Sequence, residues 1–163
     1  MTPLISRATR QRWRSRGRTF FWRCGGAVDL LHHLADFVFK EPSPALPAYA
    51  DVGAVRTALK PHCTYLRTTQ SFDDVVLLND IARAFKHHRP DHGTPTVAVS
   101  TAIVPVASGW GTMRWDEGKY GGAEQVVVTK TDGDKRAVSS VLQNVFDAWM
   151  RLLGQPLLPI NQF

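Results

Sequence analysis

Histidines and carboxylates gather in one short stretch of the sequence and raise the question of a metal site. His87, His88, Asp91 and His92 offer imidazole and carboxylate groups, which suit zinc or nickel. Adjacent histidines on a helix point in different directions, and Pro90 interrupts the spacing that would align the others. We therefore expect a solvated helix end there, where cationic side chains interact favourably with the helix dipole.

The two cysteines offer thiol chemistry but lack the partners that it needs. Cys24 and Cys63 are far apart in the sequence and form no CxxC pair. Cys63 follows His62, but neighbouring residues on a strand face opposite sides, which disfavours a nucleophile with its base. A thiol-dependent enzyme acting through Cys63 stays an alternative that would need a resolving partner. This cysteine usage favours a reducing compartment.

Two glycine-containing segments have the wrong surroundings for ligand-binding loops. The segment 109–112 (Gly-Trp-Gly-Thr) lacks the third glycine of a dinucleotide loop and leads into a predicted strand, so no helix N-terminus follows to bind phosphate. The segment 132–134 (Asp-Gly-Asp) lacks the other ligands of a calcium loop and predicts a plain turn. Trp110, Trp115 and Trp149 are expected in the core or at an interface. The sequence thus assigns no catalytic residue, metal ligand, cofactor or small-molecule substrate.

The strongest chemical signal is an arginine-rich N-terminus. The first acid is Asp29, and the seven basic residues before it are all arginines, whereas the rest of the chain holds 13 basic and 14 acidic residues. Guanidinium groups contact phosphates bidentately, and the aromatic rings interleaved with them stack on unpaired bases. We predict that this arm contacts RNA through the following residues: Arg7, Arg10, Arg12, Trp13, Arg14, Arg16, Arg18, Trp22 and Arg23.

The same composition fits other anionic partners. A stretch rich in Arg, Ser and Thr without acids is typical of a mitochondrial transit peptide, and a basic arm also suits an anionic membrane surface. We expect residues 1–23 to be retained and to become ordered only on a partner, because they have few apolar contacts of their own. The longest stretch without formal charge, 92–113, contains Pro95, Pro105 and Gly109, which excludes a membrane-spanning helix there.

Length and composition predict one globular domain with an arm. The chain has 163 residues, of which 44% are hydrophobic and 21% charged, close to the averages of folded proteins. A body of this size buries enough apolar surface to fold without a disulfide or a metal. We expect a basic arm over 1–23, a helix and Pro-containing linker over 24–61, a folded domain over 62–155 and a C-terminal tail over 156–163.

The spacing of apolar residues predicts helices that alternate with strands. Helices are expected over 27–39, after the breakers Gly25 and Gly26, and over 51–59, 71–89 and 138–153. Strands are expected over 62–69, 96–104, 106–115 and 124–130, with a hairpin connection at 118–122 and a turn at 132–133. The domain order is β-α-β-β-β-α. A right-handed parallel crossover followed by an antiparallel hairpin gives an α/β, thioredoxin-like layout of two or three layers.

Several local sequences occur in an order that is similar to a known family. Residues 81–90 (Ile-Ala-Arg-Ala-Phe-Lys-His-His-Arg-Pro) end a helix, 95–99 form a strand, Val104-Pro105-Val106 opens the next, and 126–149 lead from an apolar strand into a helix. From about 62 to 153 the chain resembles a thioredoxin-like family shared by mitochondrial ribosomal proteins and a small accessory subunit of respiratory complex I. Gly17-Arg18-Thr19 and Val38-Phe39-Lys40 are most similar to its small-subunit ribosomal member.

The resemblance implies a non-enzymatic structural subunit of the mitochondrial small ribosome, located in the matrix. Its arm would contact ribosomal RNA, and its body would contact neighbouring mitoribosomal proteins. A large-subunit relative or a complex I accessory subunit is the alternative within large assemblies. These family members lack the redox CxxC of thioredoxin, as this chain does. The proline that Pro105 matches stands where thioredoxin-like folds often hold a cis bond.

Overall fold

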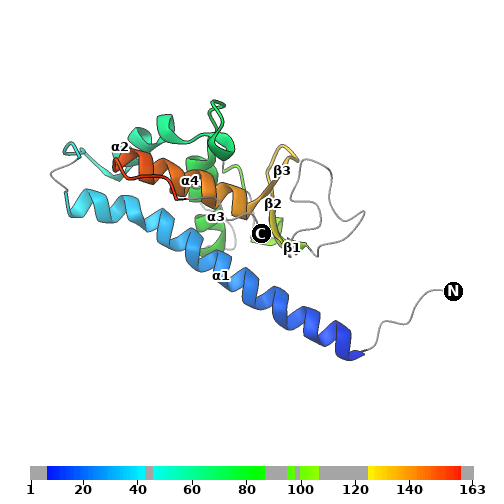
Figure 1. Ribbon diagram of the computed structural model, residues 1–163. Coiled ribbons are helices and arrows are strands. Elements are labelled where there is room, and N and C mark those ends of the chain that lie inside the picture. Colours follow the sequence, from blue (N-terminus) through cyan, green and yellow to red (C-terminus); the bar gives the residue numbers. More distant parts are fainter. Residues whose placement is uncertain (1–6, 43–45, 87–94, 98–99, 107–124, 159–163) are drawn as a thin grey trace.

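The computed structural model of the protein is a mixed α/β fold that is mostly helical (Figure 1). It describes residues 7–42, 46–86, 95–97, 100–106 and 125–158, and within these ranges it leaves the side chains of 7–23, 66, 100, 106 and 125 undescribed. The helices are α1 (Arg7–Lys40), α2 (Val52–Leu59), α3 (Asp74–Lys86) and α4 (Val138–Leu152). A small antiparallel sheet lies at one end of this helical bundle.

Helix α1 includes most of the segment that was predicted to be an unfolded arm. Its backbone is helical from Arg7 onward, so the expectation that residues 1–23 become ordered only on a partner is wrong for 7–23. The chain has no proline between Pro3 and Pro42, and arginine is a good helix former. Gly25 and Gly26, predicted as breakers, lie inside the helix. A Cβ at Gly25 would lie 4.0 Å from the Phe85 ring, so α1 approaches α3 closely there.

The second half of α1 belongs to the main core. Val28, Ala35 and Val38 of α1 are buried together with Leu59 of α2 and with a row of residues from α3 and α4. Within this core, α1 packs against α2, α3 and α4. The segment 24–61 therefore shares its core with the segment that follows. The second half of α1 is fixed by its packing against α2, α3 and α4.

Local hydrogen bonds explain where the shorter helices begin and end. The predicted helix over 51–59 is confirmed, and the Asp51 side chain caps it by accepting a 2.7 Å hydrogen bond from the Ala54 amide. Helix α3 begins at Asp74, later than predicted, because Ser71 pairs with Thr64 in an isolated bridge. Helix α4 confirms the predicted closing helix, and Gly154 ends it with φ of +65°.

Only one of the predicted strands is confirmed as placed. Strands β1 (Ile103–Val106), β2 (Gln125–Thr129) and β3 (Lys135–Ala137) form an antiparallel sheet in the order β1-β2-β3. Strand β2 and the turn at 132–133, where Gly133 has φ of +91°, were predicted. The strand expected over 106–115 lies outside the described residues except at Val106, and the connection at 118–122 lies outside them entirely.

Short 3₁₀ turns stand where the strand over 62–69 was predicted, and the described part of 96–104 is a strand only at Ile103 and Val104. The segment 62–69 contains the end of η1 (Lys60–His62) and η2 (Tyr65–Arg67), and Arg67 takes a left-handed conformation with φ of 66°. In the segment 96–104, bends at Thr96 and Val97 and η3 (Ser100–Ala102) precede β1. No described strands pair in parallel, and the Pro105 peptide bond is trans. The described residues thus do not confirm a thioredoxin-like arrangement.

Buried carboxylates connect elements that are far apart in the sequence. Asp74, at the start of α3, is only 1% exposed and accepts hydrogen bonds from Arg136 of β3 (2.8 Å) and Asn144 of α4 (2.6 Å). Asp147 of α4 is equally buried and accepts a 2.8 Å hydrogen bond from Arg67. Because buried charges require paired partners, the contacts of Asp74 fix how α3, α4 and β3 meet, and the contact of Asp147 holds the segment around Arg67 against α4.

Replacing Gly26 with alanine tests whether α1 is continuous. A Cβ at Gly26 meets no atom within 4 Å, so Gly26→Ala should stabilise the fold by about 0.5–1 kcal/mol through lower backbone entropy in the unfolded chain. Urea denaturation measures this change. A helix that began after Gly26, as the sequence predicted, would gain nothing from the substitution.

Removing the partner of Asp74 should destabilise the protein strongly. We expect Arg136→Met to lower the free energy of unfolding by about 3–5 kcal/mol, because the buried carboxylate loses its charged partner. The control is Lys60→Met, which breaks an exposed pair with Asp73 at 3.6 Å and should cost less than about 1 kcal/mol. Equal effects of the two substitutions on urea denaturation would contradict a structural role for the buried pair.

Candidate functional site

The nine residues predicted to contact RNA all lie on one continuous helix. The structure places Arg7 to Arg23 in the first half of α1, which runs on past α3 and α4 (Figure 1). At 1.5 Å per residue this half spans about 24 Å. Positions 7, 10, 14 and 18 follow one another by three or four residues and therefore share one side of the helical backbone. The helical backbone thus carries all the predicted arginines on one element.

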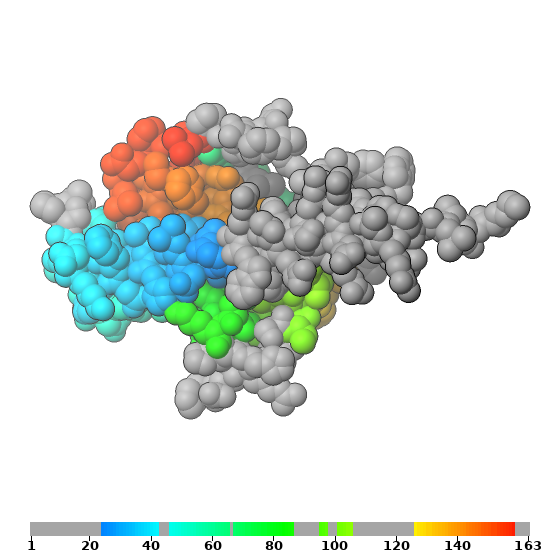
Figure 2. Space-filling model, turned by 90° about the horizontal axis from the view of Figure 1, so that it is seen from below, coloured from blue at the N-terminus to red at the C-terminus, as the bar shows by residue number. Residues whose placement is uncertain are grey.

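The second half of α1 carries an apolar surface. Leu30 is 71% exposed and Phe37 is 62% exposed, and their separation by seven residues places them on the same face of the helix. Phe39 is also exposed. Figure 2 shows that this half of α1, coloured blue to cyan, lies across the face of the molecule seen from below. Large exposed apolar side chains on one helix face are typical of protein contact surfaces.

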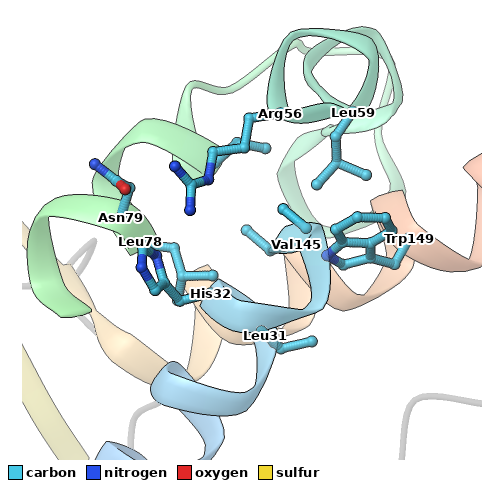
Figure 3. Close-up of a pocket in the computed structure, with 10 residues that line it drawn as sticks. Leu31, His32, Arg56, Leu59, Leu78, Asn79, Val145 and Trp149 are labelled. Atoms are coloured by element: carbon cyan, nitrogen blue, oxygen red, sulfur yellow. The ribbon is translucent and has the colours of Figure 1, made fainter. Parts of the chain in front are cut away.

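A pocket lies where α1, α2, α3 and α4 meet (Figure 3). His32 of α1, Arg56 of α2 and Asn79 of α3 gather at one end, and Leu59 and Trp149 lie at the other. The pocket has an empty volume of about 240 Å³, part of it open to solvent, and encloses space for about one water molecule. It is therefore smaller than the usual binding site of a small-molecule substrate.

Two polar atoms of residues that line this pocket are buried without a hydrogen-bond partner among the described residues. They are Nδ1 of His32 and Nε1 of Trp149. Burial lowers the pKa of His32 to about 4, with further contributions from the nearby Arg56, His33 and Lys86. The imidazole of His32 is therefore neutral at neutral pH, and one of its nitrogens carries a free lone pair.

A cluster of polar and charged side chains continues from His32 along α1. His33 Nδ1 lies 3.1 Å from Asp36 Oδ2, and Lys86 of α3 contacts His33 Nε2 at 2.5 Å. Asp29 lies 3.5 Å from both His33 and Lys86. One donor atom from each of His32, His33 and Asp36 lies within 4.8 Å of the others. Within the described residues, this is the group whose composition and geometry could hold a metal ion.

The cysteines are poorly placed for thiolate chemistry. Both are free and buried, and Cys63 has no exposed surface. Burial raises the pKa of the Cys63 thiol to about 11, and the neighbouring carboxylate of Asp74 adds to this effect. Burial also raises the pKa of Cys24. A reactive cysteine needs an accessible thiolate, so this geometry argues against a thiol-dependent enzyme that uses Cys63.

The other sequence candidates divide into structural residues and residues without a described position. The segment 132–134 is a turn in which Lys130 Nζ lies 2.7 Å from Asp132 and 3.1 Å from Asp134, so an ammonium group neutralises these carboxylates. Trp149 is buried in the core, as predicted. The remaining candidates lie outside the described residues: His87, His88, Asp91, His92, Trp110, Trp115 and the segment 109–112.

Sequence reasoning missed the polar cluster on α1, although its spacing was visible. His32 and Asp36 are four residues apart, which places them on one helix face. Adjacent histidines on a helix are expected to point in different directions, so the sequence gives no sign that His32 and His33 share a site. In the structure their rings nevertheless meet edge to face, with centroids 5.0 Å apart. The carboxylates of Asp74 and Asp147 had no sequence signal at all, because their partners are distant in the chain.

No protein-family model matches the chain, and neither curated proteins nor solved structures gave a match. Among the described residues, no helix combines the length and the apolar character that crossing a membrane requires.

The lowered pKa of His32 predicts a loss of stability in acid. The unfolded chain binds a proton near pH 6.5 and the folded protein near pH 4, so stability falls as the pH drops through this interval. Between pH 7 and pH 5 we expect a loss of about 1 kcal/mol from this group, after allowance for solvent screening of the half-buried ring.

The variant His32→Gln isolates this contribution. It removes the titrating group, so its urea midpoint should change less than that of the wild type between the two pH values. The raised pKa of Asp74 acts in the opposite sense and is common to both proteins. Identical pH profiles for the two proteins would contradict the assignment to His32.

Proposed function

We propose that the protein is a structural subunit of a ribonucleoprotein particle and binds RNA through the first half of α1. The observation that carries this proposal is the charge distribution on that helix: seven arginines and no acid before Asp29, on a backbone that is helical from Arg7. Phosphate groups release counterions when such a surface binds, which gives affinity without sequence-specific contacts. The remainder of the chain has no net excess of positive charge, so RNA binding would be confined to the helix.

The particle that the sequence resemblance suggests is the mitochondrial small ribosomal subunit, in the matrix. Among the members of that family, small-subunit protein twenty-five has a basic segment and an apolar helix in a similar order. In this proposal the exposed Leu30 and Phe37 contact neighbouring mitoribosomal proteins, since apolar side chains on one helix face suit a protein interface. The arm and this apolar face lie on one helix, so the RNA and protein contacts would be adjacent.

Salt dependence of RNA binding tests the proposal directly. The probe is a single-stranded poly(U) RNA, and the protein is the full chain. Each phosphate contact that is lost should reduce the slope of log affinity against log salt by about 0.7. We expect Arg14→Gln/Arg18→Gln to weaken binding and to reduce this slope by up to roughly 1.4. The fold should be unaffected, because these positions precede the part of α1 that enters the core.

The matched control removes the same charge from the body. Lys40→Gln/Lys60→Gln should leave affinity and salt slope unchanged, because both residues lie outside the first half of α1. Equal losses in the two double variants would mean that binding follows net charge alone and would overturn the assignment to the helix. A full chain that binds anionic vesicles but not RNA would replace the RNA partner by a membrane surface.

Co-sedimentation identifies the particle. In a mitochondrial extract, the protein should sediment with the small ribosomal subunit, and nuclease treatment should release it. Sedimentation with the large subunit or with respiratory complex I would redirect the proposal to those assemblies.

A further inference from the structure

We propose that His32, His33 and Asp36 form a zinc-binding site on α1, at the boundary between the inter-helix pocket and the surface. Two imidazole nitrogens and one carboxylate oxygen are a ligand set that suits zinc. Three protein ligands also leave a coordination position for a water molecule or for a side chain of another protein. This site is separate from the RNA-binding half of the helix and does not rest on that function.

The geometry brings the three ligands close without distorting the helix. His32 and Asp36 are separated by four residues and His33 and Asp36 by three, so all three lie within little more than one turn. Ligand atoms at a tetrahedral zinc ion lie about 3.3 Å apart, given bond lengths near 2.0–2.1 Å. The donor atoms here lie within 4.8 Å of one another. His33 and Asp36 are partly exposed and can turn by the remaining distance.

The state of His32 supports this site independently of the distances. Its Nδ1 atom is buried and has no hydrogen-bond partner among the described residues. An unpaired buried ring nitrogen carries a desolvation cost, and in the tautomer that leaves its lone pair free a metal ion relieves this cost.

Two neighbouring cations limit the affinity of the site. Lys86 Nζ occupies the Nε2 side of His33, and Arg56 lies 3.9 Å from Asp36. Their side chains are 42% and 28% exposed, so both can move toward solvent when a metal binds. Asp29, which lies 3.5 Å from Lys86, keeps a partner for the displaced ammonium group. Removing the charge of Lys86 should therefore strengthen zinc binding. A cluster with only a structural role would show no such effect.

Zinc titration of the full chain, first stripped with a chelator, tests the proposal. The affinity for Zn²⁺ is measured by competition with a chromophoric chelator, and Co²⁺ serves as the spectroscopic probe. His33→Gln and Asp36→Asn should each weaken zinc binding by at least about tenfold and should abolish the visible absorption of bound Co²⁺. Both positions are on the surface side of the helix, and circular dichroism confirms that the variants fold.

The control variants separate this site from the other histidines. Lys86→Met should tighten zinc binding several-fold, whereas His62→Gln and His87→Gln/His88→Gln should leave it unchanged. Unchanged affinity in His33→Gln and Asp36→Asn would overturn the proposal, as would a loss of binding in His87→Gln/His88→Gln. A wild-type protein that binds no Zn²⁺ at micromolar concentration would overturn it as well.

Discussion

The buried carboxylate of Asp74 is the constraint on which the rest of the fold depends. It stands at the first turn of α3 and receives hydrogen bonds from Arg136 of β3 and Asn144 of α4. Burial raises the pKa of this carboxyl, and the nearby guanidinium opposes that shift. The Arg136 guanidinium also lies over the Phe72 ring, 4.4 Å from its centroid, so its position is fixed on two sides. Moving α3 or β3 would leave the buried carboxylate without its charged partner, and moving α4 would remove the hydrogen bond from Asn144.

The arrangement of α3 and α4 also determines the position of α1. Helices α3 and α4 form the surface on which Val28 and Ala35 are buried, and the ion pair of Asp29 with Lys86 joins α1 to the last turn of α3. The first half of α1 continues the same helix, so its direction follows from packing at the second half. A basic segment whose backbone is already helical loses less backbone entropy on binding than a flexible arm does.

Helices α2, α3 and α4 and strand β2 could be predicted from the sequence, whereas the full length of α1, the other strands and the polar site could not. Apolar spacing identified α2, α3 and α4, although α3 begins later than predicted. The segment 62–69 has the composition of a strand, but Arg67 leaves extended geometry to reach Asp147, a partner 80 residues away. Thr96 likewise turns its amide toward Asp80 at 2.7 Å instead of extending a strand. Tertiary contacts of this kind override local propensity, and no window of sequence contains both partners.

The proposed RNA-binding segment and the proposed zinc site both lie on α1. The electrostatic field of the first has little effect on the second. The last arginine of the basic half is Arg23, and the first proposed zinc ligand, His32, follows nine residues later, about 14 Å along the helix axis. At physiological ionic strength the Debye length is about 8 Å, so the field of the arginines is largely screened before it reaches the zinc ligands. Asp29 lies between the two regions and further reduces the positive potential. A divalent cation at His32, His33 and Asp36 is therefore compatible with a strongly basic segment on the same helix.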